Sequence, residues 1–177
     1  MRLLVVSDTH GDARGLVAVL RLLGRSVQGL VHLGDGAADL AQAAASGCPM
    51  PPAWAVRGNV DGDWSLPPVR TIWALDRKIL AAHGHHYLDG DSYRPFLQAA
   101  EREGAAAFFF GHTHVPFWDE AGGILLLNPG SLSRPRGSWG PSFAVVEVPP
   151  QGDGWFDVKL YELHGSGSRT RLCAIQP

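Results

Sequence analysis

The first half of the chain alternates short apolar runs with polar or glycine-rich segments. Apolar runs at 3–6, 30–33 and 53–56 predict buried strands, because strands covered on both faces are apolar throughout. Between them, apolar residues at helical spacing predict helices at 12–25 and 37–45. The order strand, helix, strand, helix, strand is typical of a parallel sheet.

The second half predicts mostly hairpins. Paired apolar runs lie at 69–75 with 78–82, at 115–118 with 124–127, and at 143–148 with 156–161. An amphipathic helix at 93–103 and a strand at 106–110 separate the first two pairs. We expect a mixed sheet, or two sheets packed face to face, with helices on the outside.

Six of the apolar runs end at residues that can bind a metal ion, or in a tight turn beside one. These ends carry Asp8 and His10, Asp35, Asn59, His83, His112 and His114, and the 128–131 turn. In open α/β sheets, ligands bind outside the carboxyl ends of the strands. Two pairs, Asp8 with His10 and His112 with His114, have i, i+2 spacing, which in extended backbone points both side chains the same way. Neighbouring glycines permit the close approach that converging strand ends need.

The seven candidates are two carboxylates, four imidazoles and one amide. Nitrogen and oxygen donors suit Mn, Fe, Zn, Co or Ni. Seven ligands are too many for one tetrahedral ion, but they suit two ions that share a carboxylate. Two divalent ions would leave the site with net positive charge, so we expect it to attract an anion such as a phosphoester.

Composition narrows the class of protein. With 177 residues, 45% of them apolar, the chain suits one domain with a sizeable core. A net charge of −2 gives no reason to expect extended nucleic acid or an anionic membrane as a partner. No apolar run approaches the roughly 18 residues of a spanning helix, and Cys48 and Cys173 lie in no motif. We therefore expect a soluble, cytoplasmic protein.

The motifs together resemble those of the calcineurin-like metallophosphoesterases, most closely the small bacterial and archaeal phosphodiesterases. The matching segments, in family order, are SDTHGD at 7–12, HLGD at 32–35, RGNVD at 57–61, AHGHHY at 82–87, GHTH at 111–114 and NPGS at 128–131. The resemblance implies a four-layer α/β/β/α sandwich of two mixed sheets flanked by helices. We expect a single metallophosphoesterase domain at 1–164, followed by a flexible tail at 165–177, because residues 165–171 are polar and rich in Gly and Ser.

The resemblance assigns roles by position. It implies that Asp8, His10 and His114 bind one divalent ion, that Asn59, His83 and His112 bind a second, and that Asp35 bridges the two. Manganese is the expected ion, with Zn, Fe, Ni or Co as alternatives. The implied reaction is hydrolysis of a small phosphodiester or nucleotide by in-line attack of a metal-bridging hydroxide.

One position departs from the family pattern. Val60 stands where many members carry a histidine that can protonate the leaving group. We expect the proton to come from water or from a nearby histidine such as His85. General acid catalysis contributes about 10²–10⁴-fold, so substrates with poor leaving groups should react slowly.

Two other functions remain as alternatives. A phosphomonoesterase could use the same site, although the valine at position 60 weighs against it. A non-catalytic metal-binding scaffold for protein interaction is known on this fold, as in the retromer subunit that resembles this family. Loss of ligands is the expected mark of that route, and none of the seven is missing here. The sequence does not decide whether the chain forms a homo-oligomer.

Residues beside the motifs also have structural interpretations. His32 lies inside a strand run and is expected to be a hydrogen-bonded core histidine. The 128–131 turn is expected to brace the site, and Asp61 either supports the ligands or lies on an exposed loop. Arg134 and Arg136 follow the turn and can reach a phosphate, although a solvated loop is the favoured interpretation.

Overall fold

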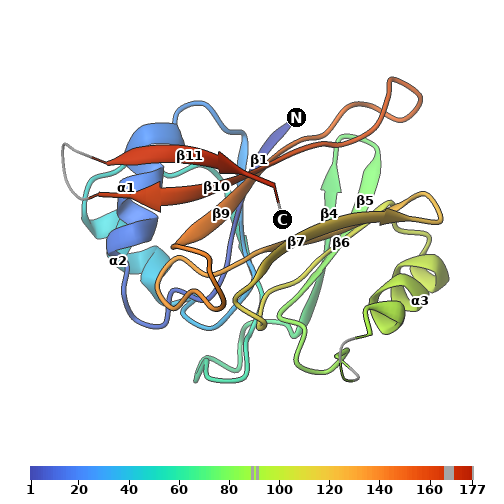
Figure 1. Ribbon diagram of the computed structural model, residues 1–177, viewed down its shortest axis with the longest axis horizontal. Helices are drawn as coiled ribbons and strands as arrows, with labels where there is room; N and C mark the ends of the chain where they lie inside the picture. Colours follow the sequence, from blue (N-terminus) through green and yellow to red (C-terminus); the bar gives the residue numbers. More distant parts are fainter. Residues whose placement is uncertain (89, 91, 166–169, 177) are drawn as a thin grey trace.

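The computed structural model describes residues 1–88, 90, 92–165 and 170–176. Along the chain it contains β1 (Arg2–Val6), α1 (Arg14–Leu23), β2 (Gly29–His32), α2 (Asp39–Ala45), β3 (Ala53–Ala55), β4 (Val69–Ala74), β5 (Arg77–Ala82), α3 (Arg94–Glu103), β6 (Ala107–Phe109), β7 (Pro116–Ala121), β8 (Ile124–Pro129), β9 (Ser142–Glu147), β10 (Asp157–His164) and β11 (Arg171–Ile175) (Figure 1). None of the described helices is long and apolar enough to cross a bilayer.

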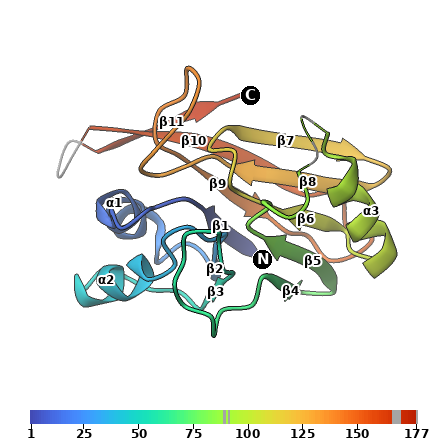
Figure 2. The ribbon, with the colours of Figure 1, turned by 90° about the horizontal axis from the view of Figure 1, so that it is seen from below.

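The strands form two sheets that pack face to face. One sheet has the order β11-β10-β9-β1-β2-β3, and the other has the order β4-β5-β6-β8-β7. Helices α1 and α2 cover the outer face of the first sheet, and α3 covers the outer face of the second (Figure 2). The predicted four-layer α/β/β/α sandwich is therefore confirmed.

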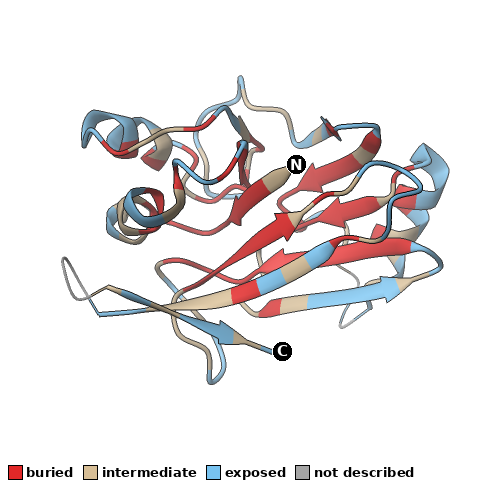
Figure 3. Ribbon diagram, turned by 90° about the horizontal axis from the view of Figure 1, so that it is seen from above, coloured by how far each residue is buried: buried red, intermediate tan, exposed pale blue. Residues whose placement is uncertain are grey.

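Strand β1 shows why the central strands are apolar throughout. Its alternate residues point to opposite faces, so Leu3 and Val5 enter the core between the sheets, whereas Leu4 and Val6 enter the core beneath α1. All four side chains are fully buried, and the central strands are buried along their length whereas the helices expose their outer sides (Figure 3). Burial of each such side chain contributes about 1.5–3 kcal/mol, which favours this two-sided packing.

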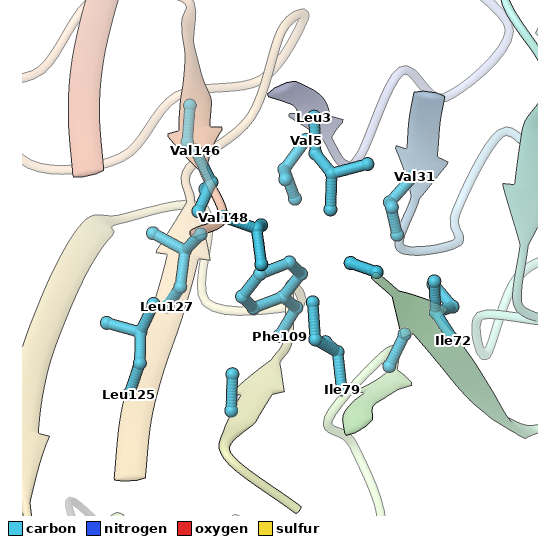
Figure 4. Packing of buried hydrophobic residues seen from close by; sticks show 14 of the residues in the cluster. Leu3, Val5, Val31, Ile72, Ile79, Phe109, Leu125, Leu127, Val146 and Val148 are labelled. Carbon is cyan, nitrogen blue, oxygen red and sulfur yellow. The ribbon is translucent and has the colours of Figure 1, made fainter. Parts of the chain in front are cut away.

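The core between the sheets fixes their relative position. Leu3, Val5 and Val31 of the first sheet face Ile79 and Phe109 of the second (Figure 4). Strands β1, β2 and β3 are parallel to one another, as are β5, β6 and β8. Each sheet thus has three parallel strands whose carboxyl ends lie on one edge.

The end of the chain differs from the prediction. Arg171–Ile175 form β11 and pair with β10, so this part of the expected tail belongs to the sheet. Leu172 lies opposite Leu163, and both pack against the core beneath α1, which explains why the apolar end of the expected tail forms a strand. Residues 166–169 and 177 of the expected tail lie outside the described residues.

Candidate metal centre

The structure brings the seven predicted ligands together at one edge of the sandwich. Four of them follow β1, β2 and β3 of the first sheet, and three follow β5 and β6 of the second. The loops after β3 and β5 lie along the lower edge of Figure 1. The ligands lie at the base of a cleft of about 430 Å³, whose lining includes His10, Asp35, Asn59, His112 and His114.

Asp8, His10 and His114 form the first group of candidate ligands. The buried Oδ1 of Asp8 lies 3.0 Å from Nε2 of His114 and 3.6 Å from Nε2 of His10. The two imidazole nitrogens are 3.2 Å apart. Ligands about 2.0–2.2 Å from one ion are about 2.8–3.6 Å apart when their directions are separated by 90–109°. The spacing therefore fits one ion.

His83 is at the centre of the second group. Its Nε2 lies 3.1 Å from Oδ1 of Asn59, 3.3 Å from Nδ1 of His112 and 3.3 Å from Oδ2 of Asp35. The same Asp35 oxygen is 4.0 Å from Nε2 of His10 in the first group. Asp35 therefore lies between the two groups, the position that a bridging carboxylate requires.

The hydrogen bonds of the imidazoles leave lone pairs facing one another. Nδ1 of His83 donates to the carbonyl of Leu33 at 2.8 Å, and Nδ1 of His114 donates to the carbonyl of Arg134. In the neutral rings, Nε2 then carries no proton. Nε2 of His83 nevertheless faces the oxygens of Asn59 and Asp35, which are acceptors as well. Such an arrangement needs either a proton on Nε2 or a bound cation, and the backbone carbonyl on the far nitrogen is the usual orienting partner of a metal-binding histidine.

Asp8 provides a second indication that the site suits a cation. Its Oδ1 is buried and accepts no hydrogen bond from the described residues. Buried polar atoms without a partner are rare, so each calls for an explanation. A metal ion satisfies this oxygen, and the set of oxygen and nitrogen donors suits a divalent ion.

The pKa values of the two carboxyl groups and of His83 depend on burial and on the charges that face one another in the site. Burial tends to raise the pKa of Asp35, but hydrogen bonds from His83 and the N–H of Val60 lower it to about 2. Burial also opposes ionisation of Asp8, yet His114 and His83 hold the pKa of this carboxyl below its usual value. Burial lowers the pKa of His83, but the two carboxylates outweigh burial and raise it. Both carboxylates are therefore ionised and available to a cation.

The backbone at the ligands is not extended, so the i, i+2 geometry expected from the sequence is wrong. Among the described non-glycine residues with left-handed φ values are Asp8 (57°), His10 (47°), Asp35 (53°), His112 (68°) and His114 (62°). The rings of His112 and His114 also diverge, because the first contacts His83 and the second contacts His10. Left-handed non-glycine residues cost about 1–3 kcal/mol each and cluster at functional sites. Their concentration here marks the cluster as functional.

Asp61 holds the loops that carry two of the candidate ligands. Its carboxylate accepts backbone N–H groups from Asp35 at 2.8 Å, Gly36 at 2.8 Å, Ala37 at 3.2 Å and Gly58 at 2.7 Å. The sequence left open whether this residue supports the site, and the hydrogen bonds show that it does. It ties the loop after β2 to the loop after β3.

The 128–131 turn braces the site as predicted. Ser131 donates its hydroxyl to the backbone carbonyl of Asp8 at 2.8 Å, and Asn128 donates to the carbonyl of Gly111 at 2.8 Å. Ser133, which the sequence interpretation missed, donates to the same Asp8 carbonyl at 2.9 Å. A hydroxyl residue two positions after Ser131 was the only signal for it.

The two arginines and His85, the remaining candidate site residues, line two different hollows. Arg134 and Arg136 are exposed, yet both line the cleft above the metal cluster together with Val60. His85 does not line that cleft. Its ring centroid is 5.5 Å from that of His83 and 6.1 Å from that of His112, and it faces a neighbouring hollow instead.

Comparisons with known proteins agree with this geometry. Residues 1–150 match the model of the calcineurin-like phosphoesterase superfamily domain. The probable metallophosphoesterase YsnB of Bacillus subtilis is 30% identical over 148 residues, which cover 84% of this chain and 85% of YsnB. Phosphodiesterase YfcE of Escherichia coli is 29% identical over 168 residues, which cover 83% of this chain and 88% of YfcE.

Solved structures show the same fold. A conserved protein of Streptococcus pneumoniae, described as a predicted phosphoesterase, has a TM-score of 0.75 at 27% identity, over 98% of this chain and 97% of its own. Vps29 of Entamoeba histolytica, complexed with Zn²⁺, has a TM-score of 0.76 at 22% identity, over 99% of this chain and 98% of its own. The sequence motifs, the fold and the family match show that the chain belongs to the calcineurin-like phosphoesterase superfamily.

Proposed function

We propose that this chain is a phosphodiesterase that holds two divalent metal ions, with manganese as the expected ion. The observation that carries the proposal is the set of lone pairs facing one another around Nε2 of His83 and the buried Oδ1 of Asp8. Asp8, His10 and His114 would hold one ion, and Asn59, His83 and His112 the other, with Asp35 between them. The YfcE relative, a phosphodiesterase by name, supports the choice of reaction.

The bound ions would supply the reacting chemistry by lowering the pKa of water towards about 7 and by neutralising charge on the phosphoryl oxygens. The protein's part is orientation. Asp61 and Ser131 fix the backbone on which Asp35 and Asp8 stand. Arg134 and Arg136 place positive charge on the wall of the cleft, where it would attract a phosphoester and help to hold it for in-line attack.

The cleft favours substrates with good leaving groups. Val60 is 60% exposed and lines the cleft, where it offers no proton. His85 lies in the neighbouring hollow, which leaves water as the proton donor that the geometry favours. We therefore expect nitrophenyl esters to be cleaved faster than alkyl esters, by a factor within the 10²–10⁴ range of general acid catalysis.

The test combines metal analysis with a substrate panel of bis(p-nitrophenyl) phosphate, p-nitrophenyl phosphate and a cyclic nucleotide. The protein should bind about two divalent ions, and Mn²⁺ should stimulate diester hydrolysis above monoester hydrolysis. His114→Ala should lose one ion and at least 100-fold in kcat, whereas His164→Ala, an exposed histidine paired with Glu162, should match the wild type.

Three outcomes would contradict the proposal. Monoesters cleaved faster than diesters would identify a phosphomonoesterase. Bound metal without hydrolysis of any ester would favour a protein-interaction scaffold on this fold. Unchanged hydrolysis by His114→Ala would defeat the two-metal assignment.

A further inference from the structure

A second hollow lies beside the metal cleft. It has a volume of about 230 Å³, and Pro68, Val69, Ala82 and Tyr87 supply much of its wall. His83 borders it as well, so the hollow shares a side chain with the metal cluster. Drug-sized ligands occupy pockets of about 300–1,000 Å³, so this hollow has room for one ring rather than for a whole nucleotide.

Arg57 brings positive charge to this hollow and contacts Trp64 beside it. The guanidinium of Arg57 lies 4.3 Å from the centroid of the Trp64 ring, and Arg57 lines the hollow. The Arg57 side chain makes no hydrogen bond or ion pair with the described residues. Its guanidinium therefore keeps its hydrogen-bonding groups available while it contacts the indole. Trp64 itself is 79% exposed. A guanidinium over an indole can offer its other face to a planar ring.

His85 also lines the hollow, and its ring is partly exposed. Its Nδ1 is buried and has no hydrogen-bond partner among the described residues. The ring packs 3.8 Å from that of His86, which also lines the hollow. A buried imidazole nitrogen without a partner needs a ligand or a water molecule to satisfy it.

We infer that this hollow is a subsite for the nucleobase of a nucleoside phosphoester whose phosphate sits at the metal cluster. The inference rests on the proposed function, which places the phosphate. The apolar walls would bury the ring, Arg57 would stack on or hydrogen-bond it, and the His85 ring would contact its edge. His112 lines the metal cleft and His85 lines the hollow, and their ring centroids are 6.1 Å apart, so the two hollows are close enough for one nucleotide to reach both.

Binding measurements separate the base from the phosphate. Titration calorimetry on the Mn²⁺-loaded protein compares adenosine 5′-monophosphate with ribose 5-phosphate, which carries a hydroxyl group in place of the base. The nucleotide should bind about 10-fold tighter or more, within the roughly 5- to 150-fold that stacking of one base provides. Equal affinity of the two ligands would overturn the inference.

Two variants locate the base. Val69→Trp fills the hollow from the first residue of β4, and Trp64→Ala removes the support of Arg57. Each should bring the affinity ratio close to one while metal content and ribose 5-phosphate affinity stay within twofold. Trp73→Ala, at another exposed tryptophan on β4, is the matched control and should keep the full ratio.

The outcomes are distinct from those of the proposed function. A preference for the nucleotide that survives in both Val69→Trp and Trp64→Ala would place the base elsewhere and overturn the subsite. If Val69→Trp fails to fold, Trp64→Ala alone decides the question, because its side chain is exposed. Hydrolysis of diesters without a base preference would support the phosphodiesterase proposal and contradict the subsite. A base preference without hydrolysis would support the subsite and contradict the phosphodiesterase proposal.

Discussion

His32 shows how one buried residue organises the strand ends. Its Nδ1 accepts the N–H of Gly34, so its proton lies on Nε2, which donates to the Thr9 hydroxyl. That hydroxyl in turn donates to the carbonyl of Gly36. The chain of bonds links β2 to the loop after β1, and it confirms the interpretation of His32 as a hydrogen-bonded core histidine.

The same bonds predict a sensitivity to acid. Burial, only partly offset by Asp61, Asp8 and Asp39, lowers the pKa of His32 to about 4, compared with about 6.5 in the unfolded chain. Between these values the unfolded state binds more protons, so the free energy of unfolding should fall as the pH falls from 6.5 to 4, by up to about 3 kcal/mol from this group.

Urea unfolding of metal-free protein at several pH values measures this loss. His32→Gln can keep both hydrogen bonds but cannot titrate. Its free energy of unfolding should therefore depend less steeply on pH, and the difference in slope should correspond to at most one bound proton. The two proteins should have the same slope above pH 7.5. Parallel curves between pH 4 and 6.5 would show that His32 is not the residue responsible.

At the level of elements, the loops after β2 and β3 act as one unit. Asp61 uses Oδ1 for Gly36 and Ala37 and Oδ2 for Asp35 and Gly58. Asp61→Asn would keep the shape but place an amide NH₂ against two N–H donors. We expect a loss of about 2–3 kcal/mol in the free energy of unfolding, with weaker retention of metal.

The matched control lies two residues away in the same loop. Asp63 is exposed, and its side chain accepts hydrogen bonds only from Ser65 among the described residues. Asp63→Asn should therefore change stability by less than about 0.5 kcal/mol and leave the metal content unchanged. Equal effects of the two substitutions, by urea unfolding and elemental analysis, would argue against a specific role for Asp61.

The sequence predicts elements better than it predicts loops. Strand β1 and helix α1 were predictable because their apolar spacing is local, and the seven candidate ligands because each follows such a run. The left-handed backbone at Asp8 and His112 was not predictable, because contacts between distant loops stabilise it. Strand β11 was missed because a polar, Gly- and Ser-rich stretch precedes its short apolar run, and its pairing with β10 is a tertiary contact. The placement of His85 away from the cleft is likewise a property of tertiary packing.

At the scale of the whole molecule, the proposed metal centre joins the two sheets. Asp8, His10, Asp35 and Asn59 follow strands of the first sheet, whereas His83, His112 and His114 follow strands of the second. Metal-free protein would instead hold two ionised carboxylates beneath four crowded imidazoles. Metal ions at this edge would therefore stabilise the sandwich as a whole as well as prepare it for catalysis.

Removal of metal should consequently lower the melting temperature. A site saturated at 100 times its Kd stabilises the folded state by about 2.7 kcal/mol, and each kcal/mol shifts Tm by about 2–4 °C in a chain of this size. Calorimetry with Mn²⁺ and with chelator should thus differ by at least about 5 °C. His10→Ala and His112→Ala, one from each sheet, should both reduce that difference, whereas His164→Ala should not. Hydrogen exchange should rise on chelation at the loops after β1, β5 and β6, while the amides of β1 and β6 stay protected by the core between the sheets. A Tm that is the same with metal and with chelator would mean that the cluster binds no structural ion, and the link between the sheets would then rest on their apolar core alone.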